Sequence, residues 1–274
     1  VFVDRGGAGR LRASVVLKAQ TRRLLDDHKA QRLAKHFTRQ WLGMESLDFL
    51  KIDRDAYGRV DPLLMEAMRE EPVAFFHHVL ERNRSVMDFL HSDYAMVNDR
   101  LARHYGLSEE VHGPEFRRVT LQPGDRRGGL LTQAGLLAMN SDGKDSHPLK
   151  RGIWLLERIL NDPPPPPPPA VPEIDLADPE ILKLTLKQRM EDHRNDPACH
   201  SCHAKIDPWG IAFENFDAVG RWRDKIGKSP VDATSKLFNK HELHGMQGLK
   251  DYLLSNRQEQ FARGLAHKLT KIGP

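Results

Sequence analysis

Both cysteines of the 274-residue chain lie three positions apart, as Cys199 and Cys202, and His203 follows the second one directly. Two thiols at this spacing on a helical turn can add to the two vinyl groups of haem, while the adjacent histidine supplies a ligand to the iron. The spacing therefore predicts one covalently attached haem c per chain, held by Cys199 and Cys202, with His203 as the proximal iron ligand.

Two other uses of the thiols stay open. A zinc site could take Cys199, Cys202 and either His200 or His203, but it needs a fourth ligand and usually a second spaced pair of cysteines. The sequence contains no further cysteine. A thioredoxin-like dithiol is expected in a βαβ context, whereas the residues before this motif have helical periodicity. Covalent haem is the use that the motif favours.

Haem iron has a sixth coordination position, and Met246 is the candidate ligand for it. It lies in the Gly-flanked segment LHGMQG before the closing helix, where small cytochromes commonly present a methionine. A thioether is a soft ligand that raises the reduction potential and closes the iron to small molecules. Packing under the last helix is the alternative use of Met246, and the competing ligands are His241, His244, His147 and Met190.

Aromatic and cationic side chains follow the motif and are candidates for contact with the macrocycle. An arginine, Arg221 or Arg223, could pair with a haem propionate. Ordinary core packing is an equal alternative for each of the aromatic residues, which are Trp209, Phe213, Phe216 and Trp222.

A turn is predicted where the chain leaves the motif, at Asp207, Pro208 and Gly210. Proline fixes φ and glycine permits a sharp reversal of the backbone. Such a turn would fold the following aromatic segment back over the edge of the haem.

The first half of the chain reads as successive helices. Apolar residues recur at threes and fours over 11–42, where Gly43 ends the run, and over 62–90, where Pro72 is predicted to divide two helices. A short helix over 98–105 ends at Gly106, and a loop with one short strand follows up to residue 125. These patterns predict an all-α bundle.

The second half combines helices, a proline run and loops. Two helices are predicted within 126–160, and Pro163–Pro169 is predicted to form a stiff polyproline II spacer. A helical segment over 178–194 precedes the motif, and a loop-rich stretch separates the motif from the closing helices. This layout is similar to small c-type cytochromes. The predicted fold class is mainly α: an N-terminal helical bundle followed by a cytochrome-c-like helical, loop-rich haem unit.

Composition excludes some partner classes. The net charge is +4 and the pI about 9.0, but Lys and Arg alternate with Asp and Glu and form no stripe, so we expect no nucleic-acid partner. No apolar run approaches the roughly 20 residues of a membrane-spanning helix, so no membrane span is expected. The segment that starts at Val1 lacks the layout of a signal peptide and does not reveal the compartment.

Three separated segments carry a resemblance: CHSCHAKIDPWGIAFENFDAVGRW, RGGLLTQAGLLAMNSDGKDSHPLKRGIWLLERILNDPPPPPPPAVPE and SDYAMVNDRLARHYG. In these the chain resembles the planctomycete-type cytochrome-c-like multidomain proteins, which are tandem domains of unknown function with a C-x-x-C-H haem motif. The resemblance implies a periplasmic or secreted location, because relatives carry export signals and haem is attached outside the cytoplasm. It also implies that the chain is part of a larger protein.

The resemblance further implies three sequence units. They are a helical domain over 1–123, a haem-motif domain over 124–219 that contains the polyproline spacer 163–169, and a C-terminal helical domain over 220–274 that completes the haem unit.

Two functions of a haem protein follow from these observations. The first is extracytoplasmic electron transfer to or from another haem domain or a redox protein, with both axial positions of the iron filled. The second is a haem-dependent oxidative enzyme acting on an extracellular substrate such as a polysaccharide, which requires an open iron position. A zinc-binding structural module is the further alternative.

Overall fold

The computed structural model describes residues 13–27, 29–107, 111–166 and 197–271, with positions 197–201 described by their backbone alone. The α-helices are α2 (Ser14–Leu25), α3 (Ala30–Leu42), α4 (Arg54–Tyr57), α5 (Pro62–Glu81), α6 (Asp99–Tyr105), α7 (Ala134–Met139), α8 (Pro148–Trp154), α11 (Pro197–Ile211), α12 (Gly245–Asn256) and α13 (Gln258–Lys271). Shorter helical turns are η2 (Met44–Asp48), η3 (Val86–Phe89), η4 (Leu130–Thr132) and the π-helical η5 (Leu155–Ile159). The strands are β1 (Tyr94–Val97), β2 (Arg117–Thr120), β3 (Lys225–Ile226), β4 (Ser229–Pro230), β5 (Thr234–Lys236) and β6 (Glu242–His244).

The prediction of a mainly α fold is wrong, because the structure mixes helices with small sheets. In the described residues β1 pairs with β2, β3 with β4, and β5 with β6, each as a two-stranded antiparallel sheet. The N-terminal half is therefore no pure helical bundle, since it contains β1 and β2. Strands of two to four residues are too short to leave a clear period-two pattern in the sequence.

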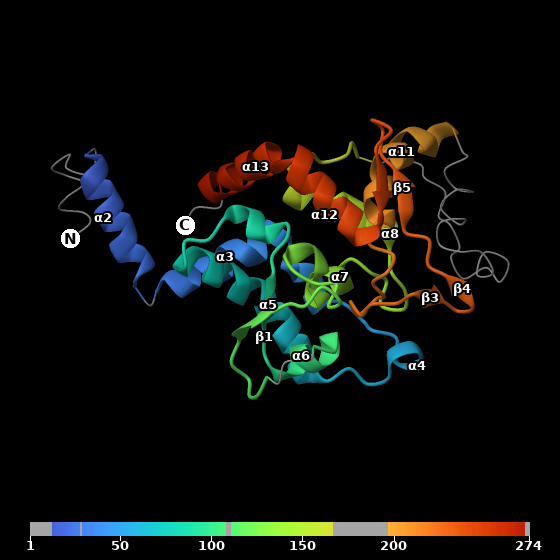
Figure 1. Ribbon diagram of the computed structural model, residues 1–274, viewed down its shortest axis with the longest axis horizontal. Helices are drawn as coiled ribbons and strands as arrows, with labels where there is room; N and C mark the ends of the chain where they lie inside the picture. The colour runs from blue at the N-terminus through green and yellow to red at the C-terminus, as the bar shows by residue number, and fades with distance from the viewer. Residues whose placement is uncertain (1–12, 28, 108–110, 167–196, 272–274) are drawn as a thin grey trace.

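Helix α11 lies near one end of the molecule, beside β5 and α8, whereas α2 projects from the body at the other end (Figure 1). Helices α12 and α13 run between these ends and connect the strands near α11 to the region of α3 (Figure 1). None of the helices in the described ranges combines the length and the apolar character that crossing a bilayer requires.

An aromatic core joins α3 to α5. Ala34, Phe37 and Trp41 recur at helical spacing along α3, and all three are buried. The ring centroid of Phe76 in α5 lies 5.2 Å from that of Phe37 and 6.4 Å from that of Trp41. Gly43 ends α3 in the left-handed conformation, with a φ of 68°, which confirms the predicted end of this helix.

Pro72 does not divide α5, so the prediction of two helices there is wrong. A proline inside a helix leaves the carbonyl four residues earlier without its usual donor. That carbonyl belongs to Met68 and packs against Gly135 of α7, where an added Cβ would lie 2.3 Å from the Met68 oxygen. The close approach of α7 covers the interrupted turn, and the sequence of α5 alone contains no sign of it.

The two halves of the chain share one core. Trp41 Nε1 donates to the carbonyl of Arg158 at 2.7 Å, and Trp154 Nε1 donates to the carbonyl of Leu42 at 3.0 Å. The ring of Phe261 in α13 lies 6.4 Å from that of Trp41. The largest apolar cluster takes side chains from α3, α5, α7, α8, α11, α12 and α13.

Several local predictions are confirmed. Asn98 caps α6 by accepting hydrogen bonds from the backbone of Arg100 and Leu101, and Gly106 ends that helix with a φ of 67°. The short strand expected between residues 106 and 125 is β2. The two helices expected within 126–160 are α7 and α8.

The proline run is described only in its first part. Residues 163–166 have no regular secondary structure, and residues 167–169 lie outside the described ranges. The helix expected over 178–194 and Met190 also lie outside them, so both stay predictions.

Helices α8 and α11 pack against each other through glycines. A Cβ on Gly152 of α8 would lie 2.7 Å from the carbonyl oxygen of Ile206. A Cβ on Gly210 of α11 would lie 1.8 Å from the carbonyl oxygen of Pro148. Because residue 152 meets residue 206 while residue 148 meets residue 210, the two helices run antiparallel, and this contact positions the cysteine motif.

Candidate functional site

The cysteine motif lies in the N-terminal half of α11, which begins at Pro197. Proline is favoured in the first turn of a helix because the N–H that it lacks has no partner there. Positions 199, 202 and 203 fall on one helical face, as residues three and four apart do. Cys202 is a half-buried free thiol that packs against the large apolar cluster. The side chain of Cys199 lies outside the described residues.

His203 is held by a carboxylate one helical turn further on. Its Nδ1 lies 3.0 Å from Oδ1 and 3.2 Å from Oδ2 of Asp207. Asp207 is 0% exposed, and the His203 side chain is 12% exposed. A carboxylate can only accept hydrogen bonds, so His203 Nδ1 is the donor in this contact, which leaves Nε2 as the ring nitrogen that a metal would use.

The predicted turn at Asp207, Pro208 and Gly210 is wrong, because α11 continues through all three residues to Ile211. Gly210 serves a close approach to α8 instead of a reversal of the chain. The role of Asp207 was also missed. The signal for it was present, since residues 203 and 207 are four apart and face each other if the motif helix continues.

The predicted aromatic residues belong to the apolar interior. Trp209 and Phe213 are buried in the same cluster against which Cys202 packs, and Met246 is buried in it as well. The ring of Trp209 lies 5.8 Å from that of Tyr252 in α12. Cys202, Trp209, Phe213 and Met246 all belong to or border this large cluster, which also includes side chains of α3 and α13. Shared membership does not place the four side by side, and their contact with a haem stays a prediction.

Phe216 and Trp222 form an edge-on ring pair at 5.2 Å. Of the two arginines considered for a propionate, Arg221 is exposed, whereas Arg223 is occupied by other partners. Arg223 donates to Asp145 Oδ1 at 2.6 Å and to Ser146 Oγ at 2.7 Å. Of these two arginines, Arg221 is therefore the one whose side chain lies at the surface.

The candidates for the sixth iron ligand occupy different places. A Cβ on Gly245, next to Met246, would lie 3.4 Å from Asn215 Oδ1, beyond the C-terminal end of α11. His244 is exposed, and the ring of His241 packs against Tyr252 at 4.7 Å. The identity of the ligand stays a prediction.

His147 caps the N-terminus of α8, where its Nδ1 accepts a hydrogen bond from the backbone N–H of Lys150 at 3.4 Å. Burial lowers its pKa to about 4. Its neighbour Pro148 lies against Gly210, which is seven residues beyond His203 and therefore about 10 Å from it along the helix axis. This end of α8 lies away from the cysteine motif.

A buried arginine fastens the chain that follows α11. Arg151 is 1% exposed and donates to the carbonyls of Phe213 (3.1 Å), Phe216 (2.6 Å), Asp217 (2.7 Å) and Leu137 (3.3 Å). Burial lowers its pKa to about 10. These bonds hold the end of α11 to α8 and α7. The local sequence around Arg151 does not predict them.

Glu214 lies in the same region and is also buried. It accepts a hydrogen bond from Ser146 Oγ at 3.0 Å and lies 3.4 Å from Arg223. Burial raises its pKa to about 7, against the opposing effect of Arg151 and Arg223.

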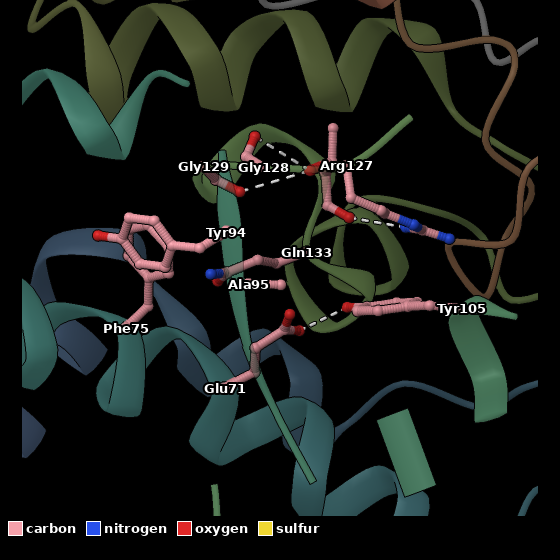
Figure 2. A pocket seen from close by; sticks show the side chains of 10 residues that line it. Glu71, Phe75, Tyr94, Ala95, Tyr105, Arg127, Gly128, Gly129 and Gln133 are labelled. Carbon is pink, nitrogen blue, oxygen red and sulfur yellow. Dashed lines mark hydrogen bonds between the residues drawn. The ribbon is translucent and has the colours of Figure 1, made fainter. Parts of the chain in front are cut away.

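A second group of buried polar residues lies between α5, α6 and the loop before η4 (Figure 2). Tyr105 donates to Glu71 Oε2 at 2.6 Å, and burial raises the pKa of Glu71 to about 8. The guanidinium of Arg127 lies 3.9 Å from the centre of the Tyr105 ring, and Gln133 lines the same cavity. The cavity measures about 10 Å³, which accommodates one water molecule and no substrate.

Lys250 of α12 is a further buried charged group, and it contacts the backbone of Arg127. It is 2% exposed, and its Nζ donates to the carbonyl of Arg127 at 3.0 Å. Burial lowers its pKa to about 7. The contact ties α12 to the glycine-rich loop after Arg127.

Among the side chains that the structure describes, no three or more of His, Cys, Asp and Glu are placed to hold a metal ion together. The donors that fit a haem are of another kind: two cysteines and a histidine on one turn of α11, with a buried carboxylate behind the histidine. A carboxylate that accepts from the second ring nitrogen is typical of metal-ligating histidines. The residues present therefore fit a haem whose iron is ligated by His203 Nε2.

Two stretches of the chain match known families. Residues 2–107 match the family described as PSD4, protein of unknown function (DUF1592), and residues 127–226 match the family described as PSCyt3, protein of unknown function (DUF1588). No curated protein and no solved structure matches the chain. The second stretch contains all of α11, and the family names point to a cytochrome-related multidomain protein. The resemblance is confirmed to that extent, while the units 1–123, 124–219 and 220–274 stay predictions.

Proposed function

We propose that the chain is a c-type haem protein that transfers electrons outside the cytoplasm. Cys199 and Cys202 hold the haem by thioether bonds, and His203 ligates its iron. The observation that carries the proposal is the contact between His203 Nδ1 and the buried carboxylate of Asp207. A histidine that ligates a metal through Nε2 commonly donates its other ring N–H to such a carboxylate.

Each part of α11 has a role in this function. A bound haem supplies an iron that gains and loses one electron. The helix holds the two cysteines and His203 on one face, and Asp207 keeps the imidazole in a single tautomer. Trp209 near the end of the helix and Phe213 just beyond it are buried in the core, so the helix that carries the histidine is fixed at this end.

The proposed partner is another haem domain or a redox protein, and the proposed location is periplasmic or secreted. The match of residues 127–226 to a family whose short name points to cytochromes supports the first part. The location follows from the cofactor, because thioether attachment of haem takes place outside the cytoplasm.

The test is expression of the chain together with a cytochrome c maturation system. A denaturing gel stained for haem is expected to show colour in the wild-type band and none in the Cys199→Ala, Cys202→Ala double variant. His267→Ala, an exposed histidine in α13, is the matched control and should keep the colour. A double variant that retained covalent haem, or a matured wild type that carried only zinc, would overturn the proposal.

Electron transfer and oxidative catalysis differ in access to the iron. With Met246 as the sixth ligand, the reduced protein should not bind carbon monoxide, whereas Met246→Ala should bind it. A wild type that binds carbon monoxide readily would favour the oxidative enzyme instead.

A further inference from the structure

The carboxylate of Asp207 is buried inside the protein. The residue is 0% exposed. Its neighbours Ile206 and Gly210 meet Gly152 and Pro148 of α8 in backbone contacts too close for an added Cβ. An ionised carboxylate is costly to bury unless it receives hydrogen bonds or a charge partner. In the described part of the chain it contacts His203 Nδ1, which lies 3.0 and 3.2 Å from its two oxygens.

The burial makes this hydrogen bond strong. Electrostatic interactions inside a protein are weakened less than in water, because the effective dielectric constant is lower. The carboxylate therefore draws the Nδ1 proton and increases the electron density on the imidazole ring. A carboxylate behind a metal-bound histidine raises the basicity of that ligand in this way.

We propose that Asp207 is a positioning residue that sets the reduction potential of the haem through His203. It fixes Nε2 as the ligating nitrogen and gives the ring partial imidazolate character. The added negative charge stabilises ferric iron more than ferrous iron, because the ferric ion carries one more positive charge. The haem then has a lower potential than a neutral acceptor at Nδ1 would give it. The inference rests on the proposed haem function.

The test compares midpoint potentials of matured proteins with equal haem content. Asp207→Asn keeps an acceptor oxygen but removes the charge, so its reduction equilibrium constant should rise at least tenfold, which is about 59 mV for one electron. Asp207→Glu, which keeps a carboxylate on a longer arm, should stay closer to the wild type than Asp207→Asn does. Glu214→Gln is the matched control, because Glu214 is another buried carboxylate near the end of α11.

A change of less than twofold in the reduction equilibrium constant of Asp207→Asn would overturn the inference. A change in Glu214→Gln as large as that in Asp207→Asn would overturn it as well. Both results leave the haem attached, so they are distinct from a failure of the proposed function, in which the wild type takes up no haem and the inference falls with it.

If the variants do not fold, proton NMR of the ferrous wild-type protein tests the inference instead. The Nδ1 proton of His203 should be strongly deshielded and exchange slowly with water. Exchange at the rate of an exposed imidazole would contradict the inference.

Discussion

At the scale of single residues, the chain contains charged groups that its interior forces towards the neutral form. Glu71 is the clearest case, because it is 1% exposed and burial raises its pKa to about 8. The hydroxyl of Tyr105 and the guanidinium of Arg127 oppose this rise without cancelling it. Such a group makes stability depend on pH.

The variant Glu71→Gln isolates this dependence. Since the folded pKa lies above the ordinary value of 4.5, the contribution of Glu71 to stability is complete below about pH 4.5 and is lost as pH rises towards 8. The wild type should therefore lose stability relative to Glu71→Gln between these values, by on the order of 5 kcal/mol in the limit. Urea unfolding of both proteins at intervals from pH 5 to 8 measures the difference.

Glu66→Gln is the control, because Glu66 is an exposed carboxylate of the same helix. Its stability difference from the wild type supplies the background for an exposed carboxylate, against which the pH dependence of Glu71→Gln is compared. A constant difference for Glu71→Gln would show that Glu71 is ionised in the folded protein.

At the scale of elements, the crossing of α8 and α11 determines where the cysteine motif lies. Gly210→Ala would place a Cβ 1.8 Å from the carbonyl oxygen of Pro148, so the backbones must separate. We expect a loss of stability of about 1–3 kcal/mol or more, as for overpacked interiors. Thermal or urea unfolding measures it.

Gly248→Ala in α12 is the matched control. A Cβ there would meet its nearest atom at 3.5 Å, which is ordinary contact. Replacement of a helical glycine by alanine then stabilises by roughly 0.5–1 kcal/mol. If Gly210→Ala behaved like Gly248→Ala, the close packing of α8 and α11 would be disproved.

Helix ends were largely predictable from the sequence, whereas interruptions were not. Gly43 and Gly106 adopt the left-handed conformation that glycine permits, so local chemistry determined both ends. Pro72 and Pro208 both lie inside helices, although proline usually ends a helix. Contacts with other elements decide these cases, as Gly135 does for the carbonyl of Met68, and they leave no mark in the local sequence.

In the candidate site, too, some features could be predicted from the local sequence and others could not. The spacing of Cys199, Cys202 and His203 follows from the sequence alone, because the motif is contiguous. Asp207 was misread as a turn residue, since its neighbours Pro208 and Gly210 resemble a turn signal. The role of Arg151 could not be predicted from the sequence, because its four acceptor carbonyls belong to residues 14 to 66 positions away.

At the scale of the whole molecule, one apolar cluster connects the part that matches PSD4 with the part that matches PSCyt3. The two hydrogen bonds from Trp41 and Trp154 cross between these parts in both directions. Elements that share a core unfold together. The chain should therefore behave as one cooperative unit despite its two family matches.

Urea unfolding of the matured protein tests this. The midpoint from far-UV circular dichroism should coincide with the midpoint from haem absorbance, which reports on α11. Trp41→Phe removes the donor to the Arg158 carbonyl and should lower both midpoints together, by about 1–2 kcal/mol in stability. Phe49→Leu, at a side chain 82% exposed, is the control and should change neither. Two separate transitions would contradict a shared core.

The central claim is that the C-x-x-C-H run holds haem covalently, and the most direct measurement is the mass of the peptide that contains it. Trypsin cleaves after Arg194 and Lys205, so both cysteines and His203 fall in the peptide of residues 195–205. From the matured protein this peptide should be recovered with the added mass of one haem and with neither cysteine open to alkylation. Recovery of the peptide without added mass, alkylated at both Cys199 and Cys202, would contradict the claim.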